Sequence, residues 1–314
     1  MMHAFTRRKF LQYGFAGLGT SVLLKGCRAS TTGGTGSSDK PIVIGSIYDQ
    51  TGGLSSLGVQ QIACQELAIE EINAKGGLLG REVQVKLYDG QSDVQTSAQL
   101  AQKLILQDKV DVLMGCLSSA AREAVRPVVS KYGGLYFYPS QYEGGVCDKQ
   151  TFLCGVTAAG IIDPMMRHAA EKMQAKQVYV IAADYNFGQI SDKWVRYYGE
   201  QYGVSVTQSD FIPFDVSDFS TTISKIQQAA PDAVVSILVG DAHEGFFGQW
   251  ANSGLKEQIP VLAASLSHPY NQDGSTRPEK ADIIAVRSYW QEDPAPAIDF
   301  IGNSVNNRNR HPLS

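Results

Sequence analysis

The chain has 314 residues, of which 43% are hydrophobic and 18% are charged, and its formal net charge is −4. A chain of this length suggests two domains, each able to bury a sizeable core. The 27 basic and 31 acidic residues form no long block of one sign, which argues against a nucleic-acid-binding surface and against a disordered acidic tail. The composition therefore indicates a soluble globular protein that binds no nucleic acid.

Residues 1–27 have the layout of an export signal. Arg7 and Arg8 precede an apolar stretch over 10–24 that is too short and too rich in glycine to be a membrane-spanning helix. The paired arginines are similar to the twin-arginine signal, and "LLKGC" is similar to a lipobox, in which the cysteine, here Cys27, carries a lipid. The sequence thus predicts a protein exported to the periplasm or cell surface and anchored in the membrane through Cys27. A secreted protein without a lipid is the alternative.

Beyond a Gly/Ser-rich flexible linker at 28–40, short β-branched or aromatic runs alternate with helical stretches. Two sets of strands are predicted, at 42–48, 83–89, 111–116 and 135–139, and at 178–183, 205–212, 233–239 and 259–264. The helices are predicted at 58–75, 94–107, 119–132, 161–174, 187–202, 218–229 and 242–253. This alternation favours βαβ units, so we expect an α/β fold with two lobes, each a parallel sheet flanked by helices, over 41–155 and 156–285.

Four cysteines follow the predicted signal: Cys64, Cys116, Cys147 and Cys154. An even number in an exported chain allows disulfide pairing, but the spacing does not determine which cysteines pair. No C-x-x-C motif and no histidine at metal-binding spacing occurs, so no metal site and no cofactor are predicted. Cys64 falls on an apolar helix face and Cys116 ends a predicted strand, so both are expected to be buried free thiols.

Polar side chains follow several of the predicted strands, at the strand ends where open parallel sheets hold their ligands. The candidate ligand-binding residues are Ser118, Ser119, Tyr138, Ser140, Glu143, Tyr185 and Asp241. Ser118 and Ser119 precede a helix, where they could cap free N–H groups that also face a ligand oxygen; plain capping is the alternative. The two tyrosines could equally be packing aromatics.

The types of these side chains bear on the ligand. Hydroxyls can meet both the carbonyl and the N–H groups of a neutral amide, whose burial without partners would cost about 1–3 kcal/mol per group. A zwitterionic amino acid would instead require a carboxylate facing its ammonium, for which Glu143 and Asp241 are the candidates. Glu143 could also accept from an NH2 group, and either acid could be a solvated loop charge.

Longer motifs bring a family resemblance. "LAIEEINAKGGLLGREVQVKLYDGQSD" at 67–93 and "AADYNFGQ" at 182–189 resemble the periplasmic binding proteins of the branched-chain amino acid class. "GCLSSAAREAVRPV" at 115–128 and "YPSQYEG" at 138–144 are similar to the urea and short-chain amide branch, which serves ABC transporters. The resemblance runs over residues 42–301.

The resemblance implies a two-lobed type I architecture that closes on a small solute and delivers it to an ABC transporter permease. Within it, Ser119, Tyr138 and Ser140 match ligand-contacting positions, and Tyr185 stands where the second lobe closes. Urea or a short-chain amide is the ligand expected first. Branched-chain or other amino acids are the alternative, because Phe187 replaces a tyrosine of some amide binders and "NFGQ" is closer to the amino-acid branch.

Other classes of function are less well supported by the motifs. No G-x-S-x-G elbow after a strand, H-E-x-x-H or P-loop occurs, so an enzyme such as an amide hydrolase is not predicted. A ligand-sensing receptor component is a further alternative. Members of the resembled family continue well beyond the position of Gly302, which leads us to expect that 286–314 is an incomplete return segment with a polar tail.

Overall fold

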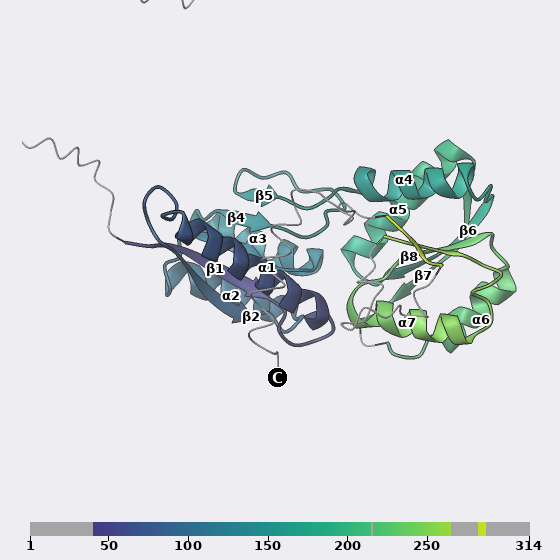
Figure 1. Ribbon diagram of the computed structural model, residues 1–314, viewed down its shortest axis with the longest axis horizontal. Coiled ribbons are helices and arrows are strands. Elements are labelled where there is room, and N and C mark those ends of the chain that lie inside the picture. The colour runs from purple at the N-terminus through teal and green to yellow at the C-terminus, as the bar shows by residue number, and fades with distance from the viewer. Residues whose placement is uncertain (1–39, 215, 265–281, 287–314) are drawn as a thin grey trace, which may run out of the picture. The chain divides into compact units, whose positions relative to one another are not determined.

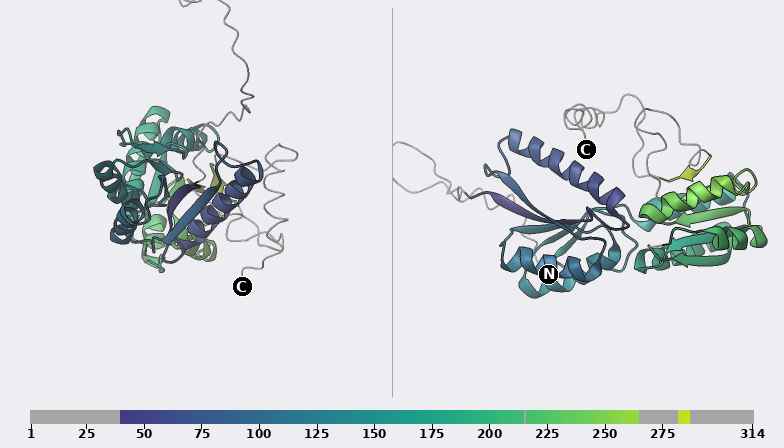
Figure 2. Two further views of the ribbon diagram at one scale, coloured as in Figure 1. Left: turned by 90° about the vertical axis from the view of Figure 1, so that its left-hand side faces the viewer. Right: turned by 90° about the horizontal axis from the view of Figure 1, so that it is seen from below.

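The computed structural model describes residues 40–214, 216–264 and 282–286. Within these residues the chain forms two five-stranded parallel sheets with helices packed on them, which confirms the predicted α/β class (Figures 1 and 2). No helix in these ranges is long and apolar enough to cross a membrane. The predicted signal with Cys27, nearly all of the linker and the polar tail lie outside the described residues.

The first sheet has the strand order β2-β1-β3-β4-β5. Its strands are β1 (Ile42–Tyr48), β2 (Val83–Asp89), β3 (Val112–Gly115), β4 (Tyr136–Tyr138) and β5 (Thr151–Leu153). Its helices are α1 (Ser55–Ala74), α2 (Val94–Leu106) and α3 (Ser119–Tyr132). The edge strand β5 lies where the sequence predicted a loop, because three residues are too few to show the alternation of a strand.

The second sheet has the strand order β10-β9-β8-β6-β7. Its strands are β6 (Gln177–Ala183), β7 (Ser205–Ile212), β8 (Ala233–Ile237), β9 (Val261–Ala263) and β10 (Ile284–Ala285). Its helices are α4 (Ala158–Glu171), α5 (Asn186–Tyr202), α6 (Ser220–Ala229) and α7 (Gly240–Asn252). The two-residue strand β10 was not predicted either.

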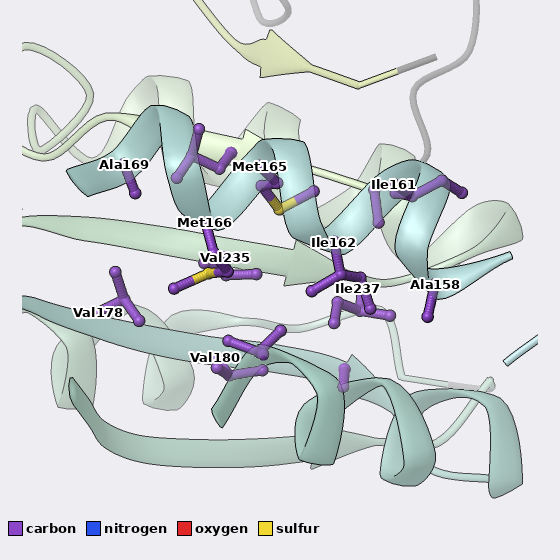
Figure 3. Close-up of a cluster of buried hydrophobic side chains, with 14 of the residues drawn as sticks. Ala158, Ile161, Ile162, Met165, Met166, Ala169, Val178, Val180, Val235 and Ile237 are labelled. Carbon is purple, nitrogen blue, oxygen red and sulfur yellow. The ribbon is translucent and has the colours of Figure 1, made fainter. Parts of the chain in front are cut away.

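The core of the second sheet follows from the period of two along its central strands. On β6, Val178 and Val180 face one layer, and Tyr179 and Ile181 face the other, and all four are fully buried. The first layer packs against α4, as Figure 3 shows, through these side chains: Ala158, Ile161, Ile162, Met165, Met166, Ala169, Val178, Val180, Val235 and Ile237. Burial on both faces explains why β6 and β8 read as nearly continuous apolar runs.

Helix α1 is held to one face of the first sheet by polar contacts. The Gln65 amide donates to the Ser46 hydroxyl at 2.6 Å. Near the other end of the helix, Asn73 exchanges two 2.8 Å hydrogen bonds with the backbone of Val83. The opposite face of the sheet carries an apolar core with α2 and α3, which includes Leu113 and Tyr136. Helix α1 therefore presents glutamines where a core helix would present aliphatic side chains.

Two glycines bring helices close to the strand ends. A Cβ at Gly58 would lie 2.0 Å from the carbonyl oxygen of Asp49, and one at Gly188 would lie 2.0 Å from that of Ala183. Any larger residue would push the first turn of α1 or α5 away from the strand that precedes it. Both first turns are thus set directly beside the carboxyl ends of β1 and β6.

Candidate functional site

A cavity of about 860 Å³ lies at the carboxyl ends of the strands. Residues at or just after the strand ends of the first sheet contribute Tyr48, Leu117, Tyr138 and Ser140; α1 contributes Leu57, Gln61, Cys64 and Gln65; and residues after β6 and β8 contribute Tyr185, Phe187 and Val239. The wall is apolar with hydroxyl and amide groups, and none of its described residues is Asp, Glu, Lys, Arg or His. This position is where open parallel sheets hold their ligands.

Three of the predicted site residues, Tyr138, Ser140 and Tyr185, line this cavity. The Tyr138 side chain is 1% exposed, and its hydroxyl donates to the Leu117 carbonyl at 2.8 Å. Burial raises the pKa of Tyr138, so the hydroxyl stays neutral and retains a lone pair that can accept from a ligand. The Ser140 hydroxyl donates to a backbone carbonyl at 3.3 Å and accepts from the Gln61 amide at 3.2 Å.

Tyr185 occupies the N-cap position of α5. Its ring packs against Phe187 and Phe214, with centroid distances of 6.0 and 5.0 Å. Burial raises the pKa of Tyr185 well above its usual value, with smaller contributions from Tyr138 and Glu143. Tyr185 is thus both a packing aromatic and a neutral hydroxyl at the cavity wall.

Ser118 and Ser119 are buried beside the cavity and are not part of its wall. The Ser118 side chain accepts from the Ala121 N–H at 3.1 Å and caps α3, as the simpler interpretation of the sequence predicted. Ser119 is 1% exposed, and its hydroxyl has no hydrogen-bond partner within the described part of the chain. An unpaired buried hydroxyl in a native structure calls for an explanation.

The two acidic candidates lie outside the cavity wall. Glu143 is not a solvated loop charge, because its carboxylate is buried against Arg122 with an N–O distance of 2.7 Å. Asp241 is exposed in the first turn of α7, where its negative charge interacts favourably with the helix dipole.

The sequence did not predict the glutamines of α1 as residues of the cavity wall. Gln61 and Gln65 line the cavity from one face of the helix, at i and i+4. The Oε1 atom of Gln61 is buried and has no partner among the described residues. The signal that could have revealed them is "QQIACQ", three amides at the start of a helix whose neighbouring residues pack on a sheet.

All four cysteines of the described residues are free thiols. Cys116 is buried, as predicted, and burial raises its pKa to about 12. The prediction for Cys64 was wrong: this thiol is exposed, because the face of α1 that carries it lines the cavity and does not meet the core. Cys154 also lines the cavity, whereas Cys147 is exposed elsewhere.

The profile of the family described as periplasmic binding protein matches residues 41–309. The chain belongs to this family. Membership confirms the coarser part of the resemblance seen in the sequence and agrees with the prediction of a binding protein rather than an enzyme. A Leu/Ile/Val-binding protein homolog of Brucella melitensis is 26% identical over 251 residues, which are 75% of this chain and 61% of the relative. The chain thus spans about three fifths of the length of that relative.

Two solved structures show the same fold. A branched-chain amino acid transporter substrate-binding protein of Streptococcus pneumoniae, in complex with isoleucine, has a TM-score of 0.72 at 20% identity over 86% of this chain and 78% of its own. An ABC transporter solute-binding protein of R. palustris, in complex with benzoate, has a TM-score of 0.77 at 20% identity over 86% and 74%. The names of these relatives refer to branched-chain amino acids and benzoate, and not to urea or amides.

Proposed function

We propose that this periplasmic binding protein is the extracytoplasmic solute-binding component of an ABC transporter. It captures a small organic solute in the cavity at the strand ends and delivers it to a permease. The observation that carries the proposal is the cavity itself, whose wall combines apolar surface with hydroxyl and amide groups in the two-sheet fold of this family. Export would follow from the signal at 1–27, with membrane attachment through Cys27.

The preferred ligand carries a carboxylate group on an apolar body. The glutamine amides of α1 can donate to the ligand's oxygen, and the hydroxyl of Ser140 stands beside them. Leu57, Phe187 and Val239 offer apolar surface to its body. The names of the relatives point to ligands of this kind, namely branched-chain amino acids or aromatic acids.

Urea and short-chain amides are the second candidate. The observation that favours them is the absence of charged side chains from the described wall. A buried ammonium without a facing carboxylate is costly, and so is a buried carboxylate without a facing cation, so an uncharged wall suits a neutral amide better than a charged solute. A receptor component that senses the same solute would use the same cavity, but the transporter is the proposal here.

Calorimetric titration of the purified full chain with isoleucine, benzoate, acetamide and urea tests this proposal. Saturable binding of isoleucine or benzoate supports the preferred ligand class. Binding of acetamide or urea alone would replace it with the second candidate. No heat from any of the four solutes would contradict both ligand classes, and release of ammonia from acetamide would contradict a binding protein.

A further inference from the structure

A buried ion pair behind the cavity is not used by the proposed contacts with the solute. Arg122 of α3 and Glu143, in the segment after β4, are joined by two hydrogen bonds, Nη2 to Oε1 at 2.7 Å and Nη1 to Oε2 at 3.3 Å. Their side chains are 1% and 0% exposed. Such a two-pronged contact fixes the geometry of both partners more firmly than a single hydrogen bond does.

The guanidinium also backs the aromatic part of the cavity wall. Its carbon lies 4.9 Å from the ring centroid of Tyr138 and 5.2 Å from that of Tyr142, close enough for cation–π contact. Burial alone would lower the pKa of Arg122, but the hydrogen bond and charge of Glu143 outweigh it and raise the pKa above its usual value. The arginine therefore stays charged behind the Tyr138 ring.

Glu143 continues the contact into α5. Its Oε1 accepts from the Asn186 amide at 3.3 Å, and its backbone carbonyl accepts from the Trp194 indole at 2.8 Å. The first turn of this helix carries Tyr185 and Phe187 to the cavity wall. Glu143 thus contacts α3 on one side and α5 on the other.

These contacts leave little room for Glu143 to serve as an ammonium ligand. Both carboxylate oxygens are occupied by the guanidinium, and the side chain is fully buried outside the cavity wall. Removing one partner of such a pair would leave the other charge buried and unpaired. The contacts of Glu143 are therefore suited to holding α3 and α5 together.

We infer that Arg122, Glu143 and Asn186 are positioning residues of the binding site. They hold the ring of Tyr138 and the first turn of α5, with Tyr185 and Phe187, in the arrangement that the solute meets. The inference rests on the proposed function in that it takes the cavity as the solute site. Glu143 touches no solute in this account.

Asn186→Ala is the sharpest test, because it removes the link from the Glu143 carboxylate to the first turn of α5 and leaves the ion pair and the Trp194 hydrogen bond in place. Gln189→Ala, one turn further along α5, is the matched control, since within the described part of the chain its side-chain amide donates only to the exposed Asp184 carboxylate. Isoleucine, benzoate and acetamide are titrated into the full chain. We expect Asn186→Ala to raise the dissociation constant about three- to tenfold, mainly through faster dissociation, and Gln189→Ala to leave it unchanged.

Glu143→Gln separates positioning from direct contact with a ligand. If Glu143 were the direct partner of the solute's ammonium group, this variant would weaken the binding of isoleucine alone. If Glu143 is a positioning residue, the variant weakens the binding of every solute that binds by a similar factor. Amide hydrogen exchange without ligand gives a second measurement: in Asn186→Ala, exchange at 186–191 should rise while that at 94–106 stays as in the wild type. Unchanged exchange at 186–191 would overturn the inference.

The solute class and the positioning role of these residues are tested by different outcomes. If the wild-type chain binds none of the solutes, the proposed ligand classes fail, and the exchange measurement still decides whether these residues hold α5. If the wild type binds but folded Asn186→Ala binds equally tightly with the same dissociation rate, the positioning role is wrong while the proposed function stands.

Discussion

Replacing Ser119 by alanine should move stability and affinity in opposite directions. The Ser119 hydroxyl is buried and has no partner within the described residues, so the unliganded protein gains nothing from it. Leaving such a group unpaired costs about 1–3 kcal/mol, and alanine is also the better helix former in the first turn of α3. We therefore expect Ser119→Ala to raise the free energy of unfolding of the unliganded chain by about 1 kcal/mol.

Affinity should fall with the same substitution if the solute, on binding, reaches this hydroxyl, which lies outside the cavity wall in the unliganded chain. If a ligand oxygen or N–H group pairs with this hydroxyl, its loss should cost about 1–2 kcal/mol, roughly a five- to thirtyfold higher dissociation constant. Ser118→Ala is the matched control at the neighbouring residue. It removes the cap of α3 and should lower stability by about 1 kcal/mol while affinity changes little.

Both quantities are measured on the same proteins. Unfolding is followed in guanidinium chloride, because urea is itself a candidate ligand, and affinity is measured by calorimetry. Lower stability of Ser119→Ala with affinity retained would refute the reasoning, since the hydroxyl would then serve the fold and not the solute.

Three further predictions follow from single residues. Tyr138→Phe should lower both stability and affinity, the former by about 1–3 kcal/mol, because the buried carbonyl that its hydroxyl serves loses its donor; denaturation and calorimetry on one sample would show an error if stability were unchanged. Partial burial alone would raise the pKa of Asp148, but hydrogen bonds from Arg126, the backbone N–H of Gln150 and Thr151 lower this pKa to about 2. The carboxylate thus stabilises the fold above the unfolded pKa near 4, so Asp148→Asn should cost about 1 kcal/mol at neutral pH, with a difference that vanishes as pH falls from about 4 to 2; a pH-independent difference in unfolding free energy would contradict this. Replacing Arg7 and Arg8 together by lysine should leave precursor in the cytoplasm, as fractionation and immunoblotting would show, and normal export would remove the twin-arginine hypothesis.

The long elements and the strand-end location of the cavity could be predicted from the sequence. Strands such as β1 and β6 carry enough β-branched residues to be recognised from the sequence. Parallel topology places polar residues such as Tyr138 and Ser140 at the same edge of the sheet. The edge strand β5 could not be predicted because its three residues are shorter than any period.

The contacts of individual side chains could not be predicted from the sequence. Helical periodicity placed Cys64 on an apolar face, but whether that face meets a core or a cavity depends on tertiary packing. The pairing of Glu143 with Arg122 joins residues 21 positions apart in different elements, and no local pattern announces it. Which acid is free to meet a ligand is therefore a property of the fold.

Ligand protection of thiols tests whether this cavity holds the solute, because the exposed cysteines lie both on and off the cavity wall. The full chain is alkylated with iodoacetamide, with and without isoleucine, benzoate or acetamide, and each site is quantified by peptide mass spectrometry. A solute that binds should slow alkylation of Cys64 and Cys154, which line the cavity, and leave that of Cys147 unchanged. A solute that binds by calorimetry but slows neither Cys64 nor Cys154, or slows Cys147 equally, would contradict the assignment of this cavity as the solute site.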